Sequence, residues 1–283
     1  MPLPIIDTHV HVWDFDHAEY EWLNGDTSIL NRTYKIEELS AIRAEAGVSH
    51  GVLVQAANNF EDTDWMLHVS STTDWISGVV GWVPLVDPHH AGRALEKYMQ
   101  NPYFKGIRHL IHNEADDQWL LQHTVVESLQ LLEHYGLPYD VVGINTRHIE
   151  TALKVAEKVP GLKMVFDHLN QPPIAAKQLY GEWGEMMAVA AQHPNFYAKI
   201  SGLCTASGNF TGWTKDDLAP YINFALQHFG AHRCFCGGDW PVSLLAGSYT
   251  HTWHAYQDIL SNLLSEDELR KVYFDNAKDF YRI

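Results

Sequence analysis

The chain opens with a short apolar run that carries two histidines, Pro4-Ile5-Ile6-Asp7-Thr8-His9-Val10-His11-Val12-Trp13. In a β-strand, side chains two residues apart point to the same face. His9 and His11 can therefore aim at one point from a single rigid element, with Asp7 below them on that side. Two imidazoles held in this way suit the binding of a cation or of a polarised oxygen.

The composition is that of an ordinary globular protein, with 283 residues, 46% of them hydrophobic and 19% charged. The formal net charge of −16 argues against binding to nucleic acid or to an anionic membrane surface. The N-terminus lacks a basic region followed by a long apolar stretch, and no apolar run approaches the roughly 20 residues of a membrane span. We therefore expect neither a signal peptide nor a transmembrane helix. The three cysteines then predict reduced thiols and a cytoplasmic protein.

Strand-like apolar runs alternate with segments of helical periodicity along the whole chain. After the first strand, we expect strands over residues 51–56, 78–85, 105–111, 138–143, 161–167, 195–201 and 233–239. We expect helices over residues 35–46, 60–70, 91–100, 117–135, 146–159, 174–193 and 214–229, and a C-terminal helix that begins at Ser265. Capping boxes open the last two helices, at Thr214 to Asp217 and at Ser265 to Glu268.

This alternation predicts an α/β fold, a single (β/α)8 TIM barrel over residues 1–283. An open doubly wound sheet is the competing architecture. It is disfavoured because no Gly-x-Gly-x-x-Gly motif follows any predicted strand.

Polar residues at the strand ends locate the candidate site, because active sites of such barrels lie at the C-terminal ends of the strands. Four residues stand out there: His9, His11, His168 and Asp239. A core histidine is the alternative for His168, and a turn cap is the alternative for Asp239. Their joint placement favours a site, since the first, sixth and eighth strands can converge across a closed barrel but not across an open sheet.

Three motifs resemble those of the amidohydrolase superfamily: Asp7-Thr8-His9-Val10-His11, Phe166-Asp167-His168-Leu169-Asn170 and Gly237-Gly238-Asp239-Trp240-Pro241. Within it, the chain resembles the branch of sugar-acid lactonases, such as L-fucono- and L-rhamnono-lactonases, and pyrone-dicarboxylate lactonase. The resemblance covers nearly the whole chain. It implies a barrel of the metal-dependent-hydrolase type that hydrolyses a cyclic ester or related bond, in which His9, His11, His168 and Asp239 match the family's site residues.

The chain departs from the binuclear members of the superfamily, which carry a carboxylated lysine at the end of the fourth strand and a histidine on the fifth. Lys105 stands at the wrong end of the fourth strand, and residues 138–143 contain no histidine. We therefore expect at most one divalent ion, zinc, held by His9, His11 and Asp239, with His168 as a further candidate ligand. Some members of the lactonase branch work without metal, so a metal-free enzyme is the alternative.

The predicted reaction is the hydrolysis of a carboxylic ester. Asp239 is the expected general base, which activates a water and returns the proton to the departing ring oxygen. His9, His11 and His168 would polarise the carbonyl oxygen, directly or through a metal. Candidate substrate-binding residues are Arg108, His109 and Lys199, each with an internal salt bridge as the alternative.

Tryptophans predict the substrate class. Trp13, Trp22, Trp213 and Trp240 fall in loops that follow strands, and indole faces pack against the C–H faces of sugars. Arginines near strand ends are few, whereas a dicarboxylate lactone would call for several. The expected partner is thus a small neutral aldonolactone, contacted by Trp13 and Trp240 among others. A metal-dependent decarboxylase and a non-catalytic sugar-binding barrel are the alternatives, and both a monomer and a homo-oligomer are compatible with the sequence.

Overall fold

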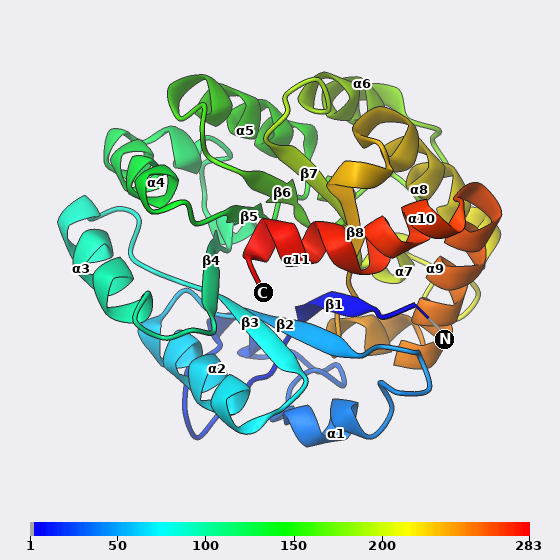
Figure 1. The fold of residues 1–283 in the computed structure, drawn as a ribbon, viewed down its shortest axis with the longest axis horizontal. Helices are drawn as coiled ribbons and strands as arrows, with labels where there is room; N and C mark the ends of the chain where they lie inside the picture. The colour runs from blue at the N-terminus through cyan, green and yellow to red at the C-terminus, as the bar shows by residue number, and fades with distance from the viewer. Residues whose placement is uncertain (1–2) are drawn as a thin grey trace.

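The computed structural model describes residues 3–283, and its centre is one sheet of eight parallel strands that follow each other in chain order. The strands are β1 (Ile6–Val10), β2 (His50–Val54), β3 (Ile76–Gly81), β4 (Phe104–His109), β5 (Tyr139–Val141), β6 (Met164–Phe166), β7 (Phe196–Ile200) and β8 (Cys234–Cys236). Figure 1 shows the helices arranged around these strands. The predicted (β/α)8 architecture is confirmed.

Two hydrogen bonds between β1 and the end of β8 close the barrel. The His11 N–H donates to the Trp240 carbonyl at 2.7 Å, and the Asp239 N–H donates to the His9 carbonyl at 2.8 Å. Gly237 permits this approach, because a Cβ atom there would lie 2.5 Å from the Cβ of His9. Asp7 strengthens the seam by accepting the Gly238 N–H at 2.7 Å. The open sheet is therefore wrong for this chain.

Eleven α-helices and several shorter helical turns lie in the described residues. The α-helices are α1 (Ile36–Ser40), α2 (Phe60–Thr72), α3 (Pro88–Tyr98), α4 (His123–Tyr135), α5 (Thr146–Lys158), α6 (Gly181–Ala190), α7 (Leu203–Ala206), α8 (Lys215–Phe229), α9 (Tyr249–Leu263), α10 (Glu266–Arg270) and α11 (Asn276–Tyr281). The shorter turns are η1 (Glu21–Leu23), η2 (Ile111–Asn113), η3 (Trp119–Leu121), η4 (Asp167–Asn170), η5 (Ala231–Arg233), η6 (Val242–Ala246) and the π-helical η7 (Lys271–Asp275).

The structure confirms both capping boxes and shortens three predicted helices. Thr214 and Ser265 each make the reciprocal bonds of the box. The helix expected over 174–193 begins only at Gly181, because Lys177 and Tyr180 adopt positive φ angles of 50° and 78°. The helix expected over 117–135 begins at His123, after the 3₁₀ turn η3, and the one expected over 35–46 ends at Ser40 and continues as turns.

Helix α9 was not predicted, although its sequence carries the signal. Trp253, Tyr256 and Leu260 are fully buried and recur at helical spacing. Ser248 caps the helix by accepting the His251 N–H at 3.1 Å. The helix lies between the end of β8 and the C-terminal helices, and its Tyr249 bonds to Asp7 at the barrel seam.

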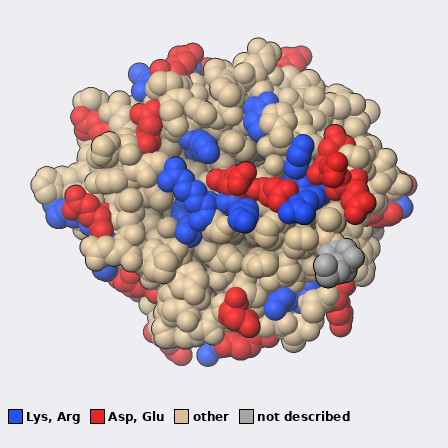
Figure 2. Space-filling view, in the orientation of Figure 1, with Lys and Arg blue, Asp and Glu red and all other residues tan. Residues whose placement is uncertain are grey.

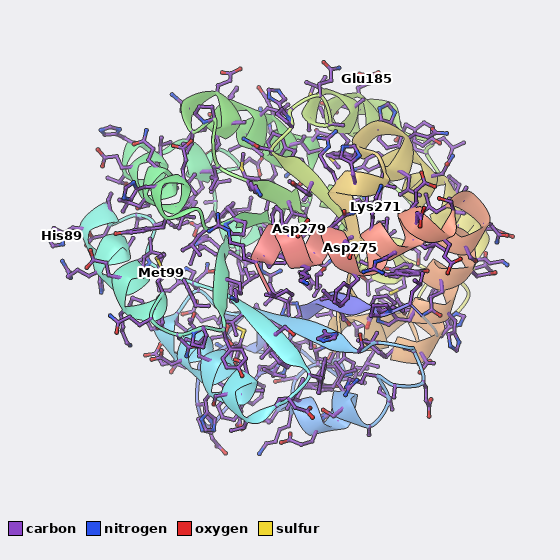
Figure 3. The ribbon with its side chains drawn as sticks, viewed as in Figure 1. His89, Met99, Glu185, Lys271, Asp275 and Asp279 are labelled. Atoms are coloured by element: carbon purple, nitrogen blue, oxygen red, sulfur yellow. The ribbon has the colours of Figure 1, made fainter. Side chains whose placement is uncertain are left out.

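The C-terminal segment from η7 to α11 covers the end of the barrel where the strands begin, as Figure 1 shows. Ala277, Phe280 and Tyr281 turn inward onto strand residues such as Ile6. Lys271 and Asp279 lie on the outward side of the segment (Figure 3). Lysine, arginine and carboxylate side chains alternate along this face, without a field of one sign (Figure 2). Within residues 3–283, no helix has the length and apolar character needed to cross a membrane.

Candidate active site

The four residues singled out at the strand ends converge on one point. The Oδ1 atom of Asp239 lies 3.7 Å from His9 Nε2, 3.5 Å from His11 Nε2 and 4.0 Å from His168 Nε2. All four residues are buried, with His168 the most exposed at 9%. A carboxylate surrounded by three imidazole nitrogens at the C-terminal ends of the strands is the arrangement that a barrel active site requires.

Unusual backbone conformations position the side chains of His168 and Asp239. His168 begins a left-handed turn in which it and the next three residues have φ angles between 49° and 55°. Such angles in non-glycine residues cost free energy and persist only where the surroundings hold them. Here the Trp183 Nε1–H donates to the Leu169 carbonyl at 2.8 Å, and the Asn170 Nδ2 donates to the Asn145 carbonyl at 2.9 Å. Asp239 also has a positive φ, 54°.

A hydrogen bond assigns the proton of His11 to Nδ1, whereas His9 meets a donor at each of its ring nitrogens. His11 Nδ1 lies 2.7 Å from the Val54 carbonyl oxygen, which can only accept. For His9, Arg108 Nη1 lies 3.1 Å from Nε2 and Lys199 Nζ lies 3.3 Å from Nδ1, with Asp167 Oδ1 3.5 Å from the same Nδ1. The lone pair on Nε2 of His11 therefore faces the centre of the site. A neutral imidazole in this orientation accepts a proton or a cation and cannot donate to a carbonyl oxygen.

Burial keeps two of these imidazoles neutral. Burial lowers the pKa of His9 well below its usual value, against the raising effect of Asp167. Burial likewise lowers the pKa of His168, although Asp239 and Asp167 oppose it. Neutral imidazoles near pH 7 are the form in which histidine binds metal or accepts a proton.

The donor set fits a single divalent cation. His9, His168 and Asp239 each offer one ligand atom, and these atoms lie within 4.8 Å of one another. Ligands at zinc bond lengths stand about 3.4 Å apart in a tetrahedron, close to the separations from Asp239. The predicted ligand set was His9, His11 and Asp239, with His168 as a further candidate. The structure instead groups His168 with His9 and Asp239. The guanidinium of Arg108 beside His9 Nε2 would compete with a cation for that lone pair.

A cavity of about 300 Å³, within the range usual for small-molecule sites, is lined by His11, His168 and Asp239, whereas the fully buried His9 is not in its lining. Trp13 and Arg108, two of the candidate substrate-binding residues, line it. The other lining residues are Trp22, Ala56, Leu110, His112, Asn113, Val142, Ile144, Gln171, Gly202, Thr205 and Val242. His112 is not among the residues predicted for the site, and its position three residues after the candidate His109 was the available signal.

His109 lies behind the wall of this cavity rather than in it. Its ring stacks on Trp119 with centroids 3.9 Å apart. The Trp82 Nε1–H donates to His109 Nδ1 at 3.0 Å, so the ring proton of the neutral form sits on Nε2, 2.7 Å from Glu114 Oε1. From this position His109 holds Glu114 at the mouth instead of reaching into the cavity.

Two further predicted substrate-binding residues also lie outside the cavity lining. Lys199 is fully buried below the site, where its Nζ donates to Asp140 Oδ2 at 2.6 Å and lies 2.7 Å from Asp167 Oδ1. Trp240 is 2% exposed and packs edge-on against Tyr34, with ring centroids 5.5 Å apart. Both residues support the residues around the site, and the internal ion pair considered for Lys199 is the arrangement observed.

A second, outer cavity of about 640 Å³ adjoins the first and shares Trp22, Leu110 and Asn113 with it. Its wall is acidic, with carboxylates from Asp16, Glu19, Glu21, Glu61 and Glu114. These charges make the approach to the inner cavity unfavourable for anions.

Comparison with known proteins places this geometry in a family. The profile of the amidohydrolase family matches residues 6–283. The chain belongs to the amidohydrolase family. This amidohydrolase is 32% identical over 281 residues to an L-fucono-1,5-lactonase of Burkholderia ambifaria, with 98% of this chain and 95% of the relative covered.

Solved structures agree with this assignment. A crystal structure of an amidohydrolase from Burkholderia multivorans with bound zinc matches with a TM-score of 0.91 and 25% identity, and covers 99% of both chains. The 2-pyrone-4,6-dicarboxylic acid hydrolase described for Pseudomonas putida matches with a TM-score of 0.75 and 19% identity over 100% of this chain and 98% of that one, which shows a shared fold.

Proposed function

We propose that this amidohydrolase hydrolyses the ester bond of a neutral sugar-acid lactone, as an enzyme of cytoplasmic carbohydrate metabolism. The observation that carries the proposal is the Asp239 carboxylate, which lies within 4.0 Å of three imidazole Nε2 atoms at the floor of a small cavity. The similarity to an L-fucono-1,5-lactonase over nearly the whole chain supports this substrate class.

Hydrolysis of a lactone needs a base for the attacking water and a stabiliser for the negative charge that develops on the carbonyl oxygen. Asp239 lines the cavity and is placed to take a proton from the water as its oxygen bonds to the carbonyl carbon. When the bond to the ring oxygen breaks, the same carboxyl returns that proton to the leaving alkoxide. The product is a hydroxy acid in its carboxylate form after release of a proton to solvent.

The Nε2 lone pair of His11, which faces the site, changes the role predicted for the histidines, which was to polarise the carbonyl oxygen. An imidazole with its single proton on Nδ1, as in His11, cannot donate to the carbonyl oxygen from Nε2, so direct polarisation by His11 is disfavoured. Arg108 is a permanent cation in the cavity wall and is the better placed donor for the oxyanion. The imidazole lone pair of His11 is suited to accept from the attacking water.

A divalent ion, zinc by the chemistry of the donor set, would be held by His9, His168 and Asp239. When bound, it supplies positive charge for the water and for the developing oxyanion. The bond between His11 Nδ1 and the Val54 carbonyl oxygen is of the kind that usually orients a metal-binding imidazole.

The cavity wall favours a neutral and partly apolar substrate. Among the described residues that line it, Arg108 is the one arginine or lysine, and Asp167 already accepts from that guanidinium at 3.1 Å. Val142, Ile144 and Val242 form an apolar part of the wall, which suits the C–H face or a deoxy carbon of a sugar. The acidic outer cavity disfavours dicarboxylate lactones.

The test is a panel of lactones assayed by acid release with a pH indicator, in the presence and absence of a chelator. We expect turnover of five- and six-membered aldonolactones and little turnover of a dicarboxylate lactone. Asp239→Asn should lower kcat by about 10²- to 10⁴-fold while the thermal unfolding midpoint changes little, because the isosteric amide is no base. Near-normal turnover by this variant would rule out the proposed base.

The same assay separates the alternatives. Release of carbon dioxide from a hydroxybenzoate, abolished by the chelator, would replace lactone hydrolysis by decarboxylation. Binding of sugars without turnover of any lactone would indicate a binding protein. Loss of lactone turnover in chelator with recovery on added zinc would establish the metal.

A further inference from the structure

A cluster of charged side chains lies in the barrel interior, below the active site. Lys199 on β7 donates to Asp140 Oδ2 at 2.6 Å, and its Nζ lies 2.7 Å from Asp167 Oδ1. All three side chains are fully buried. Charges removed from water are stable only when paired in good geometry, so each member restrains the others. We refer to Lys199, Asp140 and Asp167 as the buried ionic cluster.

The upper end of the cluster meets the active site at His9. His9 Nδ1 lies 3.3 Å from Lys199 Nζ and 3.5 Å from Asp167 Oδ1, and Asp167 Oδ2 accepts from Arg108 at 3.1 Å. Burial would raise the pKa of Asp167, but the Lys199 charge and His9 hold that pKa well below its usual value. The carboxylate of Asp167 favours a proton on His9 Nδ1, whereas the Lys199 ammonium favours the lone pair there, so the position of the ammonium sets which ring nitrogen carries the proton.

The lower end of the cluster meets the C-terminal helix. The hydroxyl group of Tyr281 in α11 donates to Asp140 Oδ2 at 2.8 Å, the same oxygen that accepts from Lys199. Tyr281 is 1% exposed and packs beside Ala277 and Phe280 over the end of the barrel where the strands begin. Figure 1 shows α11 lying across that end. A continuous set of polar contacts thus runs from the last helix to an active-site imidazole.

We propose that Tyr281 is a positioning residue for the reaction, acting on the imidazole of His9 through the buried ionic cluster, an inference that rests on the proposed lactone hydrolysis for its kinetic readout. The Tyr281 hydroxyl group holds Asp140, and Asp140 shares the Lys199 ammonium with Asp167. Without that hydroxyl group, the position of the Lys199 ammonium between the Asp140 and Asp167 carboxylates changes. The interaction of Asp167 with the His9 ring then changes as well.

Titration of Asp140 makes this coupling measurable. Burial raises the pKa of Asp140 to about 6, against the lowering effect of Lys199, while Asp167 raises the pKa and the Tyr281 hydroxyl group lowers it. Asp140 also lies within electrostatic reach of Tyr139 on its own strand, and Arg108 acts on Tyr281 from β4. As the pH falls through the pKa of Asp140, this residue takes up a proton and weakens its bond to Lys199. We therefore expect kcat to fall on the acid side.

The kinetic test compares Tyr281→Phe with wild type over the pH range of activity. We expect kcat to fall about 10-fold with KM changed less than about 2-fold, the size usual for a residue that orients another site group. The acid limb should move to higher pH by about one unit, because the variant lacks a donor that lowers the Asp140 pKa. A purely structural Tyr281 would leave the pH limb in place.

Tyr221→Phe is the matched control. Its buried hydroxyl group donates to the carbonyls of Pro173 and Gln178 at 3.2 and 3.1 Å, remote from the buried ionic cluster. This variant should keep the wild-type kcat and the wild-type acid limb. Thermal unfolding of both variants checks the fold. If Tyr281→Phe unfolds, Asp140→Asn takes its place, since the amide keeps the shape but does not titrate, and the step of the acid limb near pH 6 should then disappear.

A second readout does not depend on activity. Nitrogen-15 NMR of the imidazoles, with the His9 signal assigned by its absence in His9→Gln, reports which ring nitrogen carries the proton. We expect the proportion of the two His9 tautomers to differ between wild type and Tyr281→Phe. Failure of wild type to hydrolyse any lactone would remove the proposed function and leave this test intact. An unchanged His9 signal together with an unchanged acid limb would overturn the positioning role.

Discussion

His112 shows how a single side chain can lie in the active site without being part of its motifs. It follows β4 in the turn η2 and lines the inner cavity. Its Nδ1 atom is buried and has no hydrogen-bond partner among the described residues. Burial, helped by the charge of Arg108, lowers the pKa of His112 to about 4, so the ring is neutral above that pH. A neutral ring in the cavity wall suits contact with a sugar hydroxyl.

We therefore predict that His112→Ala raises KM for an aldonolactone by about 2- to 13-fold, the equivalent of one hydrogen bond of about 0.5–1.5 kcal/mol, with kcat little changed. Steady-state kinetics at pH 7 provides the measurement. His123→Ala is the control, because the His123 side chain is 88% exposed. A fall in kcat with unchanged KM would instead assign His112 to the chemical step.

Among the elements, the contact between β1 and the end of β8 forms the site, because it brings His9 and His11 next to Asp239. Gly237 leaves room for it: a Cβ atom there would lie 2.5 Å from the Cβ and 2.9 Å from the backbone nitrogen of His9. Backbone atoms cannot move aside as a flexible side chain can. A methyl group at this position must therefore push the two strands apart.

Gly237→Ala should lower the free energy of unfolding by about 1–3 kcal/mol, as overpacking of a filled interior does, and should lower activity as well. Denaturant unfolding and the lactone assay measure the two effects. Gly92→Ala in α3 is the matched control, because its Cβ atom would meet Leu131 at an ordinary 3.6 Å. Alanine in a helix should stabilise by about 0.5–1 kcal/mol. Equal stability of the two variants would show that the contact between Gly237 and His9 has no room requirement at this position.

The molecule as a whole encloses several carboxyl groups. Burial raises the pKa of Asp7, Asp62 and Asp140 to about 6 in each case. Asp62 accepts the Tyr20 hydroxyl group at 2.9 Å and the Ala56 N–H at 2.8 Å, so it ties the long loop after β1 to the end of β2. A carboxyl group with a raised pKa binds its proton more tightly in the folded than in the unfolded chain.

Its contribution to stability is thus present below the ordinary value of 3.8 and is lost as the pH rises through about 6. We predict that the free energy of unfolding of wild type, relative to Asp62→Asn, falls by up to about 3 kcal/mol across this window, at about 1.4 kcal/mol for each unit of pKa. Denaturant unfolding at a series of pH values measures the difference. A difference that stays constant from pH 4 to pH 7 would contradict the raised pKa.

At this scale, the barrel also explains which sequence-based predictions were correct. Strand order and closure followed from eight alternating units, because parallel strands joined by helices have few ways to bury both faces. The convergence of His9, His168 and Asp239 followed from closure. Helix ends were less predictable. The segment before Gly181 follows two prolines and has positive φ angles at Lys177 and Tyr180. These backbone angles depend on packing against the barrel and not on the local sequence.

By itself, the sequence determined the fold class, the motifs and the residues at the rim, since periodicity and strand ends are local properties of the chain. Only the tertiary structure decided which rim residues reach the cavity. Lys199 and Asp239 both follow strand patterns, yet Lys199 turns down to Asp140 while Asp239 turns toward the histidines. The direction of each imidazole lone pair and the hold of Tyr281 on the buried ionic cluster were likewise decided there. Such properties depend on partners that lie far away in sequence, and for Tyr281 and Asp140 the separation is 141 residues.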